Sequence, residues 1–238
     1  MSNGYIVLSR QSGLFSELQS VANNIANMST TGYRREGLIF SEVIQSGRTK
    51  SESVSMGAAR VRHTDEVQGP LKQTGGTFDF AINGDGYFLI ETDQGERLTR
   101  AGVFSTNGDG ELVTPDGFRL LDAGGAPIFV PAAASSVAIA SDGTLSADGQ
   151  PLSQIGLWEP VDQTDLRRQQ GVLFEAPGGV QPAVTGATLL QGYIEGSNVD
   201  PLIEVARMIE VQRAYEIGQS FRDKEGERTK SMIETLGK

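Results

Sequence analysis

Two short glycine-rich stretches bring oxygen-bearing side chains close together and are the first candidates for chemistry. Residues 83–86 read Asn-Gly-Asp-Gly, and residues 107–111 read Asn-Gly-Asp-Gly-Glu. A calcium loop needs oxygen ligands at alternate positions and a bidentate acid further along the chain, and neither stretch continues in that way. Asn-Gly and Asp-Gly pairs are also strong signals for tight turns. We therefore predict hairpin turns at both places and no metal site.

The residue types that most enzymes use for catalysis are scarce. The chain has no Cys, which excludes disulfides, thiolate metal sites and thiol nucleophiles. The single histidine, His63, has no partner at motif spacing and is expected at the surface. Residues 84–86 lack the Lys-Ser/Thr of a phosphate loop. Acid pairs such as Asp85 and Glu91 could serve a glycosidase, but the region is so rich in acids that such pairs arise by chance. We predict no catalytic residue, no metal and no cofactor.

Charge is distributed unevenly along the chain. The 238 residues include 20 Lys and Arg against 30 Asp and Glu, a formal net charge of −10. Residues 1–60 contribute +2, residues 61–195 contribute −11 and residues 196–238 contribute −1. An acidic chain is not expected to bind nucleic acid. The nearly neutral ends and the acidic middle predict different surfaces for these parts.

The N-terminal residues show no pattern of a cleaved signal peptide. Residues 2–20 have no basic opening region, and their longest apolar run, residues 5–8, is shorter than the ~7–15 residues that a signal peptide needs. No run approaches the roughly 18 apolar residues of a membrane span. We expect a chain that stays in the cytoplasm or is exported without a cleaved signal peptide, and that does not insert into a membrane.

The first part of the chain has the pattern of a long helix with one apolar side. Five apolar residues between positions 14 and 28 follow one another at spacings of 4, 3, 4 and 3 residues. This pattern predicts a helix from about residue 2 to residue 28 with an apolar seam that can pack against another helix. We assign residues 1–32 to this N-terminal helix. The seam residues are Leu14, Leu18, Val21, Ile25 and Met28.

Asparagines and a Ser-Thr-Thr-Gly sequence mark the end of that helix. Asn is a poor helix former, so Asn23, Asn24 and Asn27 are unusual in the last turns. Gly32 can adopt the left-handed conformation that closes a helix. We predict that the helix stops, and an extended arm starts, at Thr30, Thr31, Gly32 and Tyr33.

The middle of the chain is predicted to be an arm followed by a β domain. Residues 33–76 have the composition of an extended linker arm, with a weak strand at 57–63. From residue 77 to 175, short apolar runs alternate with turn signals every 8–12 residues, which is typical of an antiparallel sandwich or barrel. Residues 109–117 and 142–149 echo each other and predict two similar hairpins. Residues 176–200 form a Gly- and Pro-containing connector.

A second long helix is predicted over residues 201–238. Asp200 is a suitable N-cap, and Pro201 suits the first turn. The two terminal helices are natural partners for each other, so the predicted fold class is α+β, with N- and C-terminal helices that pair as a coiled coil around a central all-β domain. The apolar stripe of the second helix comprises Leu202, Val205, Met208, Ile209, Val211 and Tyr215.

Several sequence stretches together resemble the bacterial flagellar rod and hook proteins. Residues 21–27 (Val-Ala-Asn-Asn-Ile-Ala-Asn), followed by Thr-Thr-Gly-Tyr at 30–33, resemble the N-terminal signature of that family. Residues 191–199 and 208–216 resemble its C-terminal part, and residues 80–88, 98–104 and 110–117 resemble its core strands. The chain is short, unlike the hook protein. Residues 6–11 resemble the proximal-rod branch of the family. Residues 34–40 lack the longer aromatic-acidic run of the distal-rod branch. The proximal-rod branch is therefore preferred, and the distal-rod branch is the alternative assignment.

The resemblance implies a structural subunit without enzyme activity. In this family the terminal helices pair as a coiled coil that lines the inner tube of the rod, and the β domain faces outward. Subunits pass unfolded through the flagellar type III export apparatus, and the rod crosses the periplasm and transmits torque for motility. The implied partners are copies of the chain itself, other proximal and distal rod subunits, and the export apparatus.

The family resemblance implies a packing role for particular residues. The seam of the first helix should pack on the stripe from Leu202 to Tyr215, and the amides of Asn23, Asn24, Asn27 and Gln212 should bridge neighbouring subunits, because paired amides fix the register of packed helices. A calcium- or carbohydrate-binding β module is the alternative from another functional class. A secreted hydrolase is disfavoured by the lone histidine and the absence of cysteine.

Overall fold

A computed structural model describes residues 2–46, 53–183 and 186–236. The chain divides into two compact units. The helical unit comprises Met1–Met28, Arg35–Asp65 and Val199–Lys238, and the β unit comprises Ser29–Arg34 and Glu66–Asn198. The β unit therefore takes in a short piece of chain from before the segment at 35–65.

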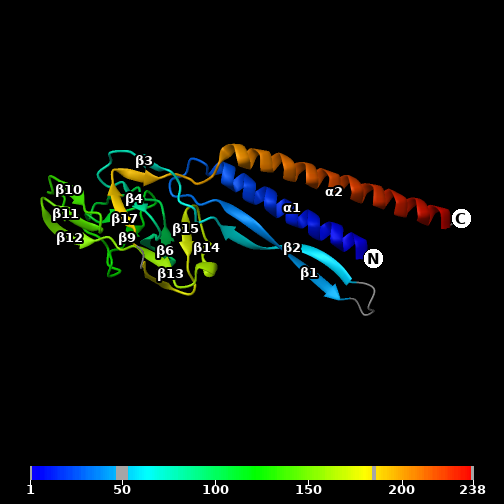
Figure 1. Cartoon of the computed structure of the whole chain (residues 1–238), viewed down its shortest axis with the longest axis horizontal. Helices are drawn as coiled ribbons and strands as arrows, with labels where there is room; N and C mark the ends of the chain where they lie inside the picture. Colours follow the sequence, from blue (N-terminus) through cyan, green and yellow to red (C-terminus); the bar gives the residue numbers. More distant parts are fainter. Residues whose placement is uncertain (1, 47–52, 184–185, 237–238) are drawn as a thin grey trace. The chain divides into compact units, whose positions relative to one another are not determined.

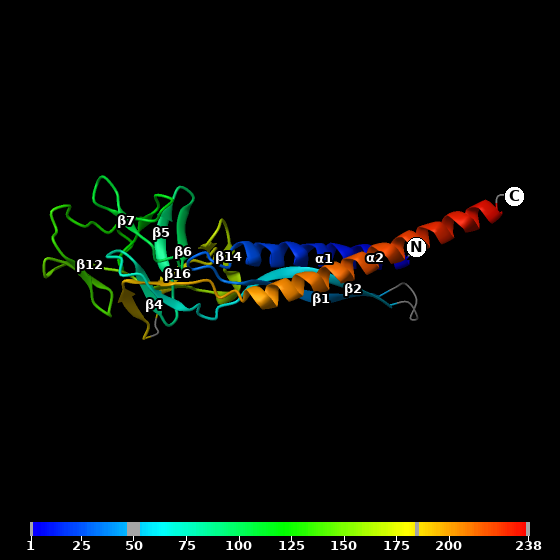
Figure 2. The same ribbon diagram turned by 90° about the horizontal axis from the view of Figure 1, so that it is seen from above.

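Two long helices form most of the helical unit. Helix α1 spans Ser2–Ala26 and helix α2 spans Pro201–Leu236, and they lie side by side in antiparallel orientation (Figures 1 and 2). The predicted N- and C-terminal helices are thus confirmed, although α1 ends two residues earlier than residue 28. Asp200 Oδ1 accepts hydrogen bonds from the N–H groups of Leu202 (2.9 Å) and Ile203 (3.2 Å), as an N-cap does. Among the described helices, none is long and apolar enough to cross a membrane.

A long β-hairpin also belongs to the helical unit and contacts α1. Strand β1 (Glu36–Ser46) pairs antiparallel with β2 (Ser53–Thr64), with an irregular register between Ile39 and Phe40. The sequence predicted only a weak strand at 57–63 in an otherwise extended arm. The difference arises because pairing along the whole length of two strands, together with contact to a helix, stabilises residues whose composition alone does not favour a strand. His63, near the end of β2, is exposed, as predicted.

The β unit is built from short antiparallel strands, which confirms the predicted strand-rich centre. Its largest sheet has seven strands in the order β14-β15-β6-β5-β9-β8-β7. A three-stranded sheet, β10-β11-β12, and the pairs β13-β16, β17-β4 and β18-β3 complete the described strands. The bounds are β3 (Leu71–Gln73), β4 (Phe80–Asn83), β5 (Phe88–Thr92), β6 (Gly95–Thr99), β7 (Ser105–Thr106), β8 (Leu112–Val113), β9 (Arg119–Leu120), β10 (Val137–Ile139), β11 (Thr144–Ala147), β12 (Gln150–Gln154), β13 (Trp158–Pro160), β14 (Arg167–Arg168), β15 (Leu173–Glu175), β16 (Val180–Pro182), β17 (Thr188–Gln191) and β18 (Tyr193–Glu195), with a 3-10 turn η1 at Gln163–Asp165.

Four of these strands lie outside the predicted range of residues 77–175. Strand β3 comes from the segment that was expected to be an arm, and β16, β17 and β18 come from the expected connector. Strand β3 pairs with β18, β17 pairs with β4, and β16 pairs with β13. Among the described strands, none of the four pairs with the strand next to it in the chain. Isolated residues 71–73 or 193–195 have no turn or period that marks them, so only the pairing makes them strands.

The two glycine-rich stretches have different structures. Residues 107–110 connect β7 to β8, which pair with each other, so this hairpin turn is confirmed. Residues 84–87 instead connect β4 to β5, which belong to different sheets, and the prediction of a hairpin there was wrong. Gly84 and Gly86 both have positive φ angles (113° and 106°), which the chain needs where it turns from one sheet into another. Hairpin turns also use glycines with positive φ, so the sequence signal does not distinguish the two structures.

The predicted internal echo corresponds to two three-stranded meanders. In the first, β7, β8 and β9 are joined by turns that include Asp109-Gly110 and Asp116-Gly117. In the second, β10, β11 and β12 are joined by turns that include Asp142-Gly143 and Asp148-Gly149.

Strand β5 lies at the centre of the β unit and is buried on both faces. The alternating side chains of residues 87–90 point to opposite faces of the sheet. Phe88 and Ile90 belong to the larger apolar cluster, whereas Tyr87 and Leu89 belong to a second one. The larger cluster consists of Phe80, Ile82, Phe88, Ile90, Phe104, Leu112, Leu120, Ile128, Val130, Leu145, Ile155 and Leu189.

Candidate assembly site

The predicted seam of α1 is only partly covered within the helical unit. Val21 is buried, Leu14, Leu18 and Ile25 are half-buried, and Met28 is exposed. Next to Leu14, an open and largely apolar groove of about 440 Å³ runs between the two helices. It is lined by Arg10, Gln11 and Leu14 of α1 and by Ala214, Ile217, Gly218 and Phe221 of α2.

The predicted stripe of α2 separates into two faces. Val211 is buried, and Met208 and Tyr215 are half-buried. Leu202, Val205 and Ile209 are exposed instead, and Leu202 retains 83% of its accessible surface. With 3.6 residues per turn, residues 202, 205 and 209 share a side of the helix on which 204 and 211 do not lie. We call Leu202, Val205 and Ile209 the outer face of α2.

A buried polar contact joins α1, β1 and α2. The Asn24 side chain is fully buried; its Nδ2 donates to the carbonyl of Glu36 (2.8 Å) and to Glu204 Oε2 (3.2 Å), and its Oδ1 accepts from the Glu36 N–H (2.9 Å). Glu204 is also fully buried and is paired with Arg35. Both amide donors of Asn24 are therefore used inside the chain. The predicted role of this amide as a bridge between subunits stays a prediction, and within the chain its hydrogen bonds are satisfied, as burial requires.

The other predicted amides lie nearer to solvent. Asn23 and Gln212 are exposed, and Asn27 is half-buried. Asn27, the first residue after α1, donates from Nδ2 to the Asn23 carbonyl (2.9 Å) and to Asn23 Oδ1 (3.3 Å). The side chains of Asn23 and Gln212 are therefore accessible to another molecule, whereas the Asn27 amide, like that of Asn24, already donates within the chain.

A second polar contact between the helices was not predicted. Glu17 of α1 is largely buried and accepts a hydrogen bond from Arg207 Nε of α2 (2.7 Å). Arg207 also contacts Glu210 (2.8 Å). A sequence signal exists for both buried acids, since Glu17 stands beside the apolar seam positions and Glu204 lies seven residues before the buried Val211. Charged residues at seam positions of paired helices commonly have a partner across the interface.

The residues predicted to stop α1 lie in the β unit. Thr30 and Thr31 are half-buried, and Gly32 and Tyr33 are buried. Gly32 has the predicted left-handed conformation (φ +69°) but stands six residues after Ala26, so it does not cap the helix. Its conformation serves a close approach instead, because a Cβ atom there would lie 2.3 Å from the Ala101 nitrogen.

Tyr33 and the following arginine are held by the β unit's interior. The guanidinium of Arg168 lies over the Tyr33 ring at 4.4 Å from its centroid, a cation–π contact. The same guanidinium lies 4.6 Å from the ring centroid of Phe174. Arg168 Nη2 also donates to the carbonyl of Arg34.

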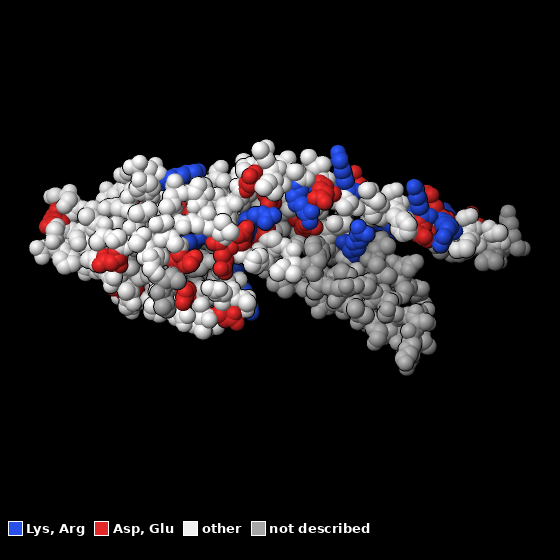
Figure 3. All heavy atoms as spheres, in the orientation of Figure 1, with Lys and Arg blue, Asp and Glu red and all other residues white. Residues whose placement is uncertain are grey.

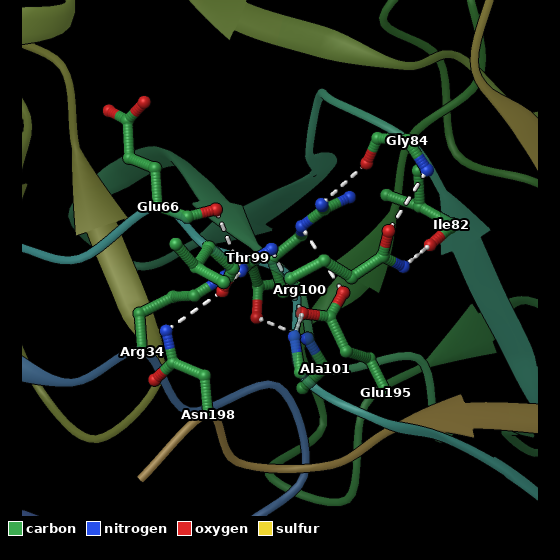
Figure 4. A network of polar contacts seen from close by, with 12 residues as sticks. Arg34, Glu66, Ile82, Gly84, Thr99, Arg100, Ala101, Glu195 and Asn198 are labelled. Atoms are coloured by element: carbon green, nitrogen blue, oxygen red, sulfur yellow. Dashed lines mark hydrogen bonds and ion pairs between the residues drawn. The ribbon is translucent and has the colours of Figure 1, made fainter.

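A cluster of buried charges surrounds Glu195 in the β unit (Figure 4). Arg34 and Glu195 each retain only 1% of their side-chain surface and form an ion pair of 2.9 Å between Nη2 and Oε1. Arg100 Nε lies 3.3 Å from Glu195 Oε2, and Arg100 Nη2 donates to the Gly84 carbonyl (2.6 Å). Two arginines face one carboxylate, and backbone carbonyls accept hydrogen bonds from Arg34 Nη1 and Arg100 Nη2. Among the described residues, the Nε groups of both arginines and Nη1 of Arg100 have no hydrogen-bond partner.

This charge cluster affects the titration of its members. Burial lowers the pKa of Arg100, and the Coulomb attraction of Glu195 opposes that effect. Burial also raises the pKa of Tyr87, and the charge of Glu66 adds to the rise. The Arg100 guanidinium lies 5.6 Å from the centroid of the Tyr87 ring. Within the described ranges, no group of three or more His, Asp or Glu side chains is arranged to hold a metal ion.

The two units differ in surface charge. The β unit contains seven basic and seventeen acidic residues, a formal balance of −10, whereas the helical unit contains thirteen of each. Basic and acidic side chains lie next to one another along α2 (Figure 3). The helical unit therefore presents no net charge that would oppose the approach of a second copy.

Comparison with known proteins places three parts of the chain in flagellar families. Residues 8–34 match the family described as flagella basal body rod protein, residues 81–147 match the flagellar hook protein FlgE/F/G D1 domain, and residues 190–221 match the flagellar basal body rod FlgEFG protein C-terminal family. The flagellar basal-body rod protein FlgF of Caulobacter vibrioides is 38% identical over 98% of this chain and 97% of the relative. FlgF of Mesorhizobium japonicum is 35% identical over the same shares. FlgG of Bacillus subtilis is 32% identical over 89% of this chain and 90% of the relative.

Proposed function

The chain belongs to the family of flagellar basal-body rod proteins, and on that premise we propose that it assembles with copies of itself through its terminal helices. It is a FlgF-like structural subunit of the rod, it is located in the flagellar basal body, and it assembles with other basal-body proteins. A role in motility follows from that place. The role is structural rather than enzymatic.

The observation that supports self-assembly most is the outer face of α2. Leu202, Val205 and Ile209 are exposed although α2 already uses its other side against α1. Burying one such side chain completely contributes about 1.5–3 kcal/mol, so three of them on each copy supply a substantial driving force. Asn23 and Gln212, which are exposed, add amides that can fix the register between copies.

The finer roles of the parts follow from this proposal. Helices α1 and α2 act as axial helices that pair as a coiled coil along the inner wall of the rod. The hairpin of β1 and β2, which lies within the predicted arm at residues 33–76, acts as the arm, and the sandwich- or barrel-like β unit faces outward. The rod then crosses the periplasm and transmits torque. The subunit reaches it through the flagellar type III export apparatus without a cleaved signal peptide.

The alternative within the family is a distal-rod role. FlgG relatives match this chain, but they do so with lower identity and over less of its length than the FlgF of Caulobacter vibrioides. The greater similarity to FlgF relatives favours the proximal-rod role.

Substitutions on the outer face test the assembly proposal. The double variant Val205→Asp, Ile209→Asp places two charges on that face, and we expect it to abolish assembly of the purified chain, measured by sedimentation and electron microscopy, and motility of a complemented strain. Helix content by circular dichroism should stay unchanged, because both residues are exposed. Phe129→Asp, at an exposed position of the β unit, is the matched control and should assemble normally. Normal assembly of the double variant would refute the proposal.

A further inference from the structure

The chain passes between the two units at four places, which lie between residues 28 and 29, 34 and 35, 65 and 66, and 198 and 199. On the β unit's side, three segments carry these passages: residues 29–34, which the chain both enters and leaves, residues 66–69 and residues 195–198. Each segment could be anchored separately to the β unit. Instead, the three passing segments are bonded to one another.

Two residues, Arg34 and Asn198, make these bonds. Arg34 Nη1 donates to the carbonyl of Glu66 (2.9 Å) and also to that of Val67. Asn198 Nδ2 donates to the Val67 carbonyl (2.8 Å), and the Asn198 N–H donates to the Tyr33 carbonyl (3.3 Å). Each of the three segments is thus directly bonded to both of the others (Figure 4).

Glu195 adds a second set of bonds that connects the same three segments. Its Oε1 accepts from Arg34 Nη2 (2.9 Å) and from the N–H of Gly69 (3.0 Å), and its main-chain carbonyl accepts from the N–H of Gly32 (2.8 Å). The approach is close, since a Cβ atom on Gly69 would lie 2.1 Å from the carbonyl oxygen of Gly196. The first, second and third segments therefore meet around one buried carboxylate.

We propose that Arg34, Glu195 and Asn198 form a collar, meaning a set of positioning residues that makes the three passing segments open and close as one unit. Two sets of bonds support this inference, those of Arg34 and Asn198 and those of Glu195, because either set alone already connects all three segments. The ion pair is buried, and a buried charge that loses its partner is unfavourable, so release of one segment exposes the bonding groups of the other two. The collar rests on the proposed function, in which force applied to the subunit during rotation would be shared among the three segments.

Hydrogen–deuterium exchange of the full-length monomer tests the collar. In R34Q we expect amide exchange to accelerate about tenfold or more, the scale for losing a charged hydrogen bond, and to do so together in residues 29–34, 66–69 and 195–198. N198A should accelerate the same three segments by a smaller factor. R119Q is the matched control, because Arg119 pairs with Glu91 and Glu111 at the surface of the same unit, and it should leave these segments unchanged.

Acceleration confined to the substituted segment in both variants would overturn the collar. If R34Q accelerates exchange throughout the β unit, N198A decides, since joint acceleration of the three segments supports the collar and an effect on residues 195–198 alone overturns it. The measurement needs no assembled rod. Joint acceleration of the three segments, in a chain that fails to assemble, would refute the proposed function and support the collar. Acceleration confined to the substituted segment, in a chain that does assemble, would overturn the collar and support the proposed function.

Discussion

The β unit buries most of its large apolar side chains, whereas the helical unit leaves many of its own exposed. Phe80, Phe88 and Phe174 are completely buried in the β unit. In the helical unit, Leu202 and Ile217 retain 83% and 71% of their accessible surface. The charges differ in the same way, since the acidic β unit carries a balance of −10 and the helical unit carries none.

This difference indicates which unit buries its apolar side chains without contact to another molecule. A large apolar cluster with strands on several sides stabilises the β unit without a partner. Two long helices and a hairpin cannot cover each other fully, so part of their apolar surface is available for other molecules. The neutral unit is suited to contact between copies, and like charge opposes close contact between β units.

The largest expected effect tests whether the β unit depends on its own core. Phe88 is fully buried, with its ring centroid 5.4 Å from that of Phe104, so Phe88→Ala should lower the free energy of unfolding of the β unit by about 3–5 kcal/mol. Trp158, the single tryptophan, lies in this unit, so its fluorescence in a urea titration reports the change. Phe129→Ala, at an exposed position, should change it by less than about 0.5 kcal/mol. Equal effects of the two substitutions would contradict a β unit that is stabilised by its own buried core.

The next effect concerns the short segment that the β unit takes from before the hairpin. Gly32→Ala should cost about 3 kcal/mol in the same titration, since the substitution combines a left-handed φ with a Cβ atom 2.3 Å from the Ala101 nitrogen. Gly75→Ala has a similar φ (+73°) and open space around it, so it should cost only about 1–2 kcal/mol. If the two variants are equally stable, residues 29–34 are not packed into the β unit.

A smaller effect in the helical unit separates residues that hold the fold from residues available for assembly. Asn24→Ala removes the acceptor of the buried Glu36 N–H and should destabilise the helices by about 1–3 kcal/mol, measured by thermal loss of circular dichroism at the helix band. Asn23→Ala, one residue away and exposed, should leave that melting unchanged and weaken assembly. The reverse pattern would assign Asn24 to contacts between subunits.

The smallest effect is a dependence of the stability of the β unit on alkaline pH. Burial and Glu66 raise the pKa of Tyr87 above its ordinary value of 10.0, so just above that pH the folded protein retains a proton that the unfolded chain releases. The contribution of Tyr87 to the free energy of unfolding is therefore at its full value below pH 10.0, and it is lost as the pH rises through the pKa of Tyr87 in the folded protein. Urea titrations of Tyr87→Phe, followed by Trp158 fluorescence, should show a smaller decrease than those of the unsubstituted chain. An identical decrease would show that Tyr87 does not contribute.

Some parts of the fold could be predicted because their signals are local. The helix at 201–236 follows from Asp200 and Pro201, and the N-terminal helix follows from the 4-3-4-3 spacing that ends near residue 28. The hairpin turns at residues 107–110 and 148–149 follow from Asp-Gly and Asn-Gly pairs, which favour positive φ angles wherever they stand.

Other parts could not be predicted because they depend on partners distant in sequence. Strand β3 exists because β18 pairs with it more than a hundred residues later. Glu195 has no local pattern that marks a buried charge, and its environment consists of Arg34, Arg100 and main-chain groups from separate segments. Asn24 is one of three similar asparagines, and only the position of Glu36 and Glu204 distinguishes the buried one.

The sequence by itself determined the two terminal helices, the strand-rich acidic centre and, through motifs spread along the chain, the flagellar rod family. Local propensities, turn chemistry and short motifs act over a few residues, so they can be read without coordinates. Tertiary structure decided which α2 residues form the outer face, that residues 29–34 belong to the β unit, and that Gly32 serves a close approach rather than a helix cap. These features depend on distances between residues far apart in sequence, which a linear pattern does not contain.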